Sequence, residues 1–149
     1  MMSYNYKAYV LAIASVSLLS LGVNISSANA EVVVVGNKSS SVQSLSAKQV
    51  KNLFLGKSLK LPNGMKAEVV DLPSGDALRA EFYSKVIHKN PSQIKAYWAK
   101  RIFTGRGVPP KSLDSQSAVI DWVSGSPGRI GYVDSSAVSG KITVLLRQP

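Results

Sequence analysis

The feature that most constrains this chain is a run of four valines, Val32 to Val35, closed by Gly36. Side chains of a strand alternate between the two faces of its sheet. A continuous apolar run with no alternation therefore predicts a strand that is buried on both faces, as in a sheet flanked by helices.

Local signals predict where the helices begin and end. Ser46 stands three residues before Gln49, which is the spacing of a capping box, and Leu45 and Val50 flank it as a hydrophobic staple. Gly56 is suited to end that helix. Further helices are predicted after the turn 73–76, from Asn90-Pro91 to Phe103, and over 115–124. The second of these is expected to have its apolar face formed by Ile94, Tyr97, Trp98 and Ile102.

Strands are also predicted over three more segments, 67–72, 129–133 and 142–146. Gly131 inside the second of these predicts close approach of a neighbouring backbone. In the last strand, Ile142, Val144 and Leu146 alternate with Thr143 and Leu145. The order β-α-β-α-α-α-β-β predicts a single three-layer α/β/α domain.

The first thirty residues have the pattern of a secretory signal peptide. Lys7 is their only charge, an apolar stretch follows, and Ala28-Asn29-Ala30 is a small-x-small cleavage site. An uncleaved membrane anchor is the alternative, although serines interrupt the stretch. We expect cleavage after Ala30, so that residues 31–149 form a periplasmic or secreted domain with no stable membrane span.

The composition excludes several classes of catalytic and metal site. The chain has no cysteine and one histidine, His88, so thiolate metal sites, disulfides and Cys nucleophiles are excluded. The carboxylates have neither metal-ligand spacing nor the pattern of an acid/base pair. We therefore expect no enzyme activity, no metal and no cofactor.

The net charge of +10 raises the question of nucleic acid. The basic residues are scattered along the chain without an aromatic-basic motif, which argues against DNA or RNA as a partner. An anionic envelope surface or an acidic protein accounts for the charge better.

Three segments in register resemble the periplasmic phosphate-binding proteins of ABC transporters. They are the helix ending in Asn52-Leu53-Phe54-Leu55-Gly56-Lys57, the turn Asp71-Leu72-Pro73-Ser74-Gly75-Asp76 with its following helix, and Ser126-Pro127-Gly128-Arg129-Ile130-Gly131-Tyr132-Val133. The resemblance implies one lobe of a type II periplasmic binding protein, in a chain of roughly half the family's length.

The turn is the candidate anion site, formed by Ser74, Gly75, Asp76 and Arg79. A Pro-Ser-Gly turn entering a helix presents free backbone amides, the Ser74 hydroxyl adds a donor, and Arg79 supplies a positive charge. The alternative is that Ser74 or Asp76 only caps the helix. Two departures favour that alternative: Val70 stands where the family has a clamping arginine, and Asp76 replaces a threonine.

The sequence thus predicts an exported binding domain for phosphate or a similar oxyanion, linked to ABC-type phosphate uptake through a transporter partner. The alternative is a non-catalytic envelope protein-interaction module that has kept the fold and lost the ligand. Both hypotheses leave open whether another chain supplies a second lobe.

Overall fold

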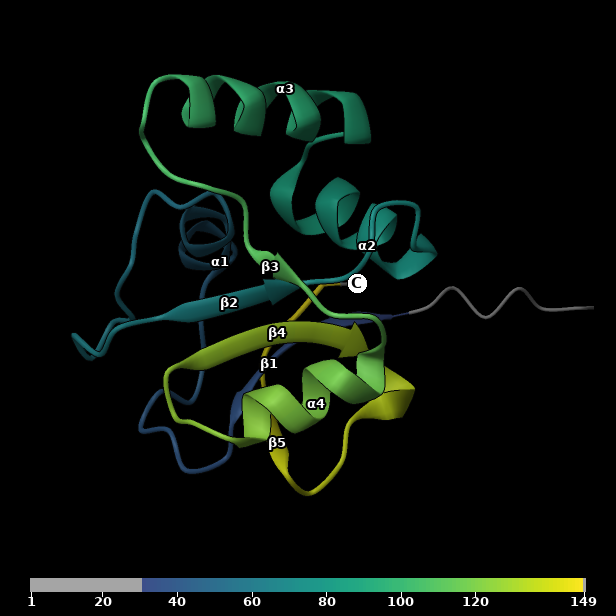
Figure 1. The fold of residues 1–149 in the computed structure, drawn as a ribbon. Coiled ribbons are helices and arrows are strands. Elements are labelled where there is room, and N and C mark those ends of the chain that lie inside the picture. Colours follow the sequence, from purple (N-terminus) through teal and green to yellow (C-terminus); the bar gives the residue numbers. More distant parts are fainter. Residues whose placement is uncertain (1–30, 149) are drawn as a thin grey trace, which may run out of the picture.

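The computed structural model describes residues 31–148 (Figure 1). The predicted leader, residues 1–30, lies outside the described residues. The elements, in chain order, are β1 (Val32–Asn37), α1 (Ala47–Phe54), β2 (Glu68–Asp71), α2 (Ala77–Phe82), a π-helical turn η1 (Tyr83–Ile87), α3 (Pro91–Phe103), β3 (Lys111–Ser112), α4 (Gln116–Ser124), β4 (Arg129–Asp134), a 3-10 turn η2 (Ser135–Ala137) and β5 (Ile142–Arg147).

The strands form one mixed sheet in the order β3-β2-β4-β1-β5. β1 pairs antiparallel with both β4 and β5, while β2 runs parallel to β4 and β3. All six residues of β1 are buried. The prediction of a strand covered on both faces is confirmed, because helices lie on both sides of the sheet.

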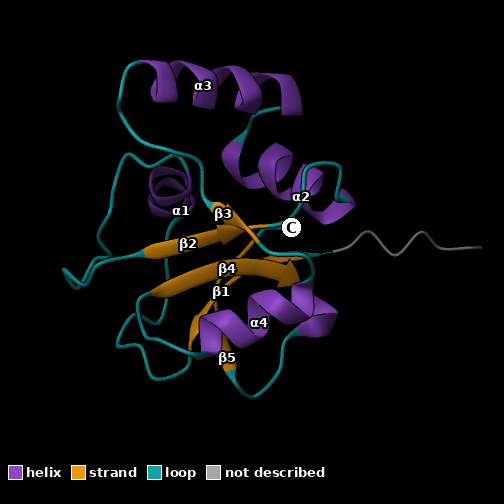
Figure 2. Ribbon diagram, viewed as in Figure 1, coloured by secondary structure: helices purple, strands orange, loops and turns teal. Residues whose placement is uncertain are grey.

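The helices make the two outer layers of an α/β/α domain, as predicted (Figure 2). α1, α2 and α3 lie on one side of the sheet, with α3 outermost, and α4 lies on the other. Two neighbouring residues of β4 pack against opposite helical layers. Tyr132 stacks on Phe82 of α2, with ring centroids 4.0 Å apart, whereas Gly131 faces Val119 and Val123 of α4.

The predicted helix starts are confirmed in detail. Ser46 and Gln49 form a reciprocal capping box, and Asn90 and Gln93 form a second one with Pro91 in the first turn. Ser115 caps α4 by accepting a hydrogen bond from the amide of Ala118. These caps satisfy backbone donors that a helix start otherwise leaves without partners.

Three predictions need correction. Close approach at Gly131 comes from side chains, not from a backbone: a β-carbon there would lie 2.5 Å from Val119 Cγ1. β5 does not keep one alternation, since a bulge between Val34 and Val35 shifts the register and buries Leu145 against Gly36. Ile102, predicted on the apolar face of its helix, is 53% exposed.

β3 was not predicted from the sequence. Its two residues, Lys111 and Ser112, pair with Val70 and Asp71 at the edge of the sheet. Because of this pairing, the segment that follows α3 lies beside the end of β2. Over the described residues, no helix is long and apolar enough to cross a membrane.

Gly131→Ala tests the fit of α4 on the sheet. Because the added methyl group would overlap Val119, we expect a loss of stability of about 1–3 kcal/mol, measured by urea denaturation. Gly140→Ala is the matched control, since a β-carbon there would meet no atom of residues 31–148 within 4 Å. Equal stability of the two variants would contradict the described packing.

Candidate functional site

The turn between β2 and α2 has the predicted bend but an occupied helix cap. Gly75 adopts φ +95°, a conformation that favours glycine, and Ser74 is exposed. The Asp76 side chain accepts a hydrogen bond from the amide of Arg79 at 3.1 Å. Asp76 therefore caps its own helix, as the capping alternative predicts for this residue.

Asp71, at the end of β2, is the most connected polar residue near this turn. Only 4% of it is exposed. Its Oδ1 accepts from the amide of Leu72 at 2.9 Å and from the hydroxyl of Tyr132. Its Oδ2 accepts from the hydroxyl of Tyr83 at 2.8 Å and from Nε of Arg79 at 3.0 Å. The buried carboxylate is thus fully satisfied, which is what makes its burial tolerable.

The same contacts shift the titration of both tyrosines. Burial, and then the negative charge of Asp71, raise the pKa of Tyr83 and of Tyr132 far above the usual value for a phenol. Both hydroxyls therefore remain protonated donors to Asp71 across the physiological range.

Arg79 is oriented by this cluster. Its guanidinium lies over the Tyr83 ring, 4.5 Å from the ring centroid, and is bonded to Asp71 through Nε. Bonding through Nε leaves the two terminal nitrogens at the far end of the guanidinium, where a planar fork can grip a second anion. The side chain is 17% exposed, and Arg79 lines a groove that opens to solvent.

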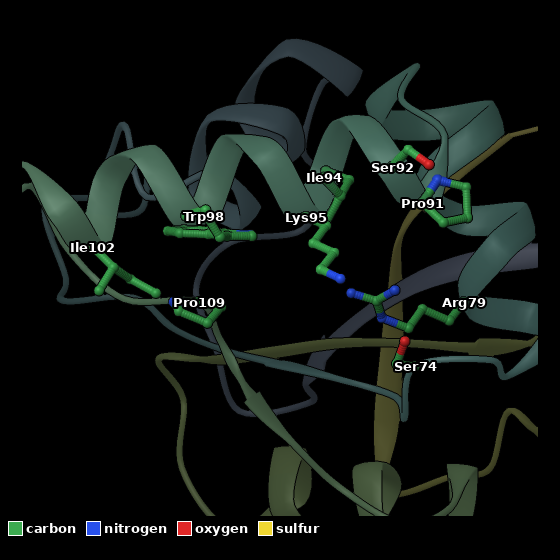
Figure 3. Close-up of a pocket in the computed structure, with 10 residues that line it drawn as sticks. Ser74, Arg79, Pro91, Ser92, Ile94, Lys95, Trp98, Ile102 and Pro109 are labelled. Carbon is green, nitrogen blue, oxygen red and sulfur yellow. The ribbon is translucent and has the colours of Figure 1, made fainter.

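A groove of about 530 Å³ opens at that end. It runs along α3 and is bounded on the other side by the segment that leads to β3. Figure 3 shows the amine of Lys95 and the guanidinium of Arg79 pointing toward one another at one end of the groove, close to the Ser74 side chain. Like charges that converge in this way repel, and an anion between them relieves the repulsion.

The structure therefore brings Ser74 and Arg79 into one groove and turns the Asp76 carboxylate to its own helix. Lys95 was missed by the sequence analysis. It stands sixteen residues after Arg79 on a different helix, and nothing local marks its side chain as facing the turn. Val70 is buried in the core, with 1% of its surface exposed.

The basic side chain of Arg101, at the end of α3, has a structural role. Arg101 donates to the carbonyls of Gly56 and Arg106 and lies over the rings of Tyr97 and Trp98. It fastens the end of α3 to the loop after α1. Within residues 31–148, no group of three or more His, Asp or Glu side chains is placed to hold a metal ion.

Several solved structures resemble this fold, and the names of these proteins link them to phosphate transport or phosphate binding. An ABC-type phosphate transport receptor from Vibrio cholerae superposes with a TM-score of 0.61 at 15% identity, over 77% of this chain and 45% of that one. A putative phosphate ABC transporter substrate-binding protein from Clostridium perfringens, solved with bound phosphate, gives 0.61 at 17% identity, over 77% and 44%. This chain has the fold of one lobe of a phosphate-binding protein.

A possible phosphate binding protein from Planctomyces limnophilus agrees, with a TM-score of 0.56 at 10% identity over 77% of this chain and 40% of that one. The chain therefore spans less than half the length of these structures. No protein-family model matches the sequence, and no curated protein matches it either. At these identities the likeness establishes the fold alone.

The raised pKa values of Tyr83 and Tyr132 predict alkaline instability. Below pH 10 both phenols are protonated in the folded and unfolded states, so nothing is lost. Above pH 10 the unfolded chain releases both protons while the folded one keeps them. Stability then falls by about 1.4 kcal/mol per pH unit for each tyrosine.

Urea denaturation at pH 9 and pH 11 measures this effect. Tyr83→Phe retains the ring but removes one of the two titrating groups, so the variant should lose less stability over the interval than the wild type. Parallel losses in the two proteins would contradict the assignment.

Proposed function

We propose that the chain is an exported, non-catalytic binding domain whose groove takes phosphate or a similar oxyanion. The observation that carries the proposal is the convergence of Arg79 and Lys95 beside Ser74 at one end of the groove. The likeness to phosphate transport receptors supports the same ligand class.

The roles of the residues follow from their contacts. Arg79 is the principal anchor because Asp71 and Tyr83 hold its guanidinium in place before any ligand arrives. Lys95 supplies the second charge, Ser74 a hydroxyl donor, and Gly75 a bend without a side chain in the way. Asp76 holds the helix start and keeps its carboxylate engaged there.

Affinity for inorganic phosphate is expected to be weak. A single lobe leaves one side of the ligand in water, where charged hydrogen bonds contribute less. A role in ABC-type phosphate uptake would then require a second lobe or a transporter protein to cover the open side.

Isothermal titration of the purified protein with phosphate at low ionic strength tests the proposal. Lys95→Gln should weaken binding roughly three- to fivefold, since one exposed charge contributes up to about 1 kcal/mol. Lys100→Gln is the matched control: it removes an exposed lysine from the same helix that does not line the groove. No heat at millimolar phosphate would refute the proposal.

A second candidate function is an envelope interaction module that keeps the fold without the ligand. Three apolar residues at the end of α3 and in the following loop favour it: Ile102, Phe103 and Val108 are 53%, 93% and 74% exposed. Binding to an isolated envelope fraction that is lost in Phe103→Ser but kept in Lys95→Gln would support this function over anion binding.

A further inference from the structure

We propose that the ligand of the groove is an amphipathic organic anion: a phosphate or carboxylate head group joined to an aromatic or aliphatic body. The proposal rests on the anion site described above and adds the part of the ligand that lies along α3. It is carried by the size of the groove, its apolar wall and the positive charge around it.

The groove is too large for an inorganic anion. Its volume of about 530 Å³ falls within the range of about 300–1,000 Å³ that is typical of small-molecule sites. A water molecule occupies about 30 Å³ in the liquid, and phosphate is only a few waters in size. An ion held by Arg79 and Lys95 would leave most of the groove unfilled.

The rest of the groove is apolar. From the charged end, its wall continues along one side of α3 through Trp98 to Ile102, with Pro109 facing them (Figure 3). Ile102 is half exposed to solvent. A hydrocarbon or aromatic group lying on this wall would remove apolar surface from water, which stabilises a complex by about 25 cal/mol for each Å².

Trp98 stands in the middle of this wall. Only 6% of the residue is exposed, and the six-membered part of its ring packs toward Gly56, where a β-carbon would lie 3.3 Å from Cη2. A ligand body on the wall would therefore meet a ring that the core already holds in place.

The charge around the groove selects an anion. Between Glu81 and Asp114 the sequence has no acidic residue, and it has basic residues at Lys85, Lys89, Lys95, Lys100, Arg101, Arg106 and Lys111. No carboxylate within this segment competes with a ligand for Lys95. Asp71 compensates Arg79, so a neutral apolar ligand would leave the charge of Lys95 beside Arg79 without a counter-ion.

Comparing phenyl phosphate with methyl phosphate measures the contribution of the apolar body, because the two compounds have the same phosphate monoester head group. We expect phenyl phosphate to bind about tenfold more tightly than methyl phosphate or inorganic phosphate, which corresponds to about 1.4 kcal/mol. Ile102→Ser should remove most of that preference. Phe103→Ser is the control, since Phe103 is 93% exposed and does not line the groove.

The two tryptophans provide a local readout. Trp122 lies on α4, on the other side of the sheet, where Arg129 covers its ring. In ¹H–¹⁵N spectra, phenyl phosphate should move the indole N–H signal of Trp98 and leave that of Trp122 in place. Trp122→Phe assigns the two signals.

The outcomes separate this proposal from the preceding one. Phosphate binding that depends on Lys95, with phenyl phosphate no tighter than methyl phosphate or equally tight in Ile102→Ser, would overturn the amphipathic ligand and leave the anion site standing. Absence of binding by all three compounds would overturn both. Preference for phenyl phosphate, lost in Ile102→Ser and accompanied by the Trp98 shift, would establish the ligand class.

Discussion

The hydrogen bonds to the buried carboxylate of Asp71 are the constraint on which the candidate site depends. Tyr132 comes from β4, Tyr83 from η1 and Arg79 from α2, so one side chain at the end of β2 ties three elements together. Removing a partner from such a buried charge costs about 3–5 kcal/mol. The position of Arg79 is therefore fixed by the core of the protein rather than by the loop that precedes it.

This arrangement changes what the turn does. In the simplest model of an oxyanion site, backbone amides at a helix start bind the ligand. Here Asp76 already occupies one of those amides, and α2 is short. The anion would therefore be bound mainly by side chains. Arg79 and Lys95 supply two positive charges and Asp71 neutralises one of them, so this end of the groove has a net positive charge.

Local sequence signals predicted the elements well and the site only in part. The capping boxes at Ser46 and Asn90 involve neighbours three residues apart, so the pattern is visible in the sequence. The valine run predicted its own burial because continuous apolar strands need two covered faces.

Interactions between distant segments were not predictable in this way. The hydrogen bond from Tyr132 to Asp71 joins residues 61 positions apart, and no local pattern links them. In the sequence, Lys95 resembles any exposed helix residue. Its place in the groove depends on the segment before β3, which lies beside α3 because β3 pairs with β2. The bulge opposite β1 likewise arises from pairing, which inverted the expected alternation near Leu145.

The position at which a heavy oxyanion binds would show whether Arg79 and Lys95 form an anion site. A crystal structure of the protein soaked in tungstate, with anomalous diffraction recorded, locates the ion without reference to any assumed site. We expect an anomalous peak between the terminal nitrogens of Arg79 and the amine of Lys95, within reach of the Ser74 hydroxyl. A fully occupied peak elsewhere on the surface, with none in the groove, would contradict it.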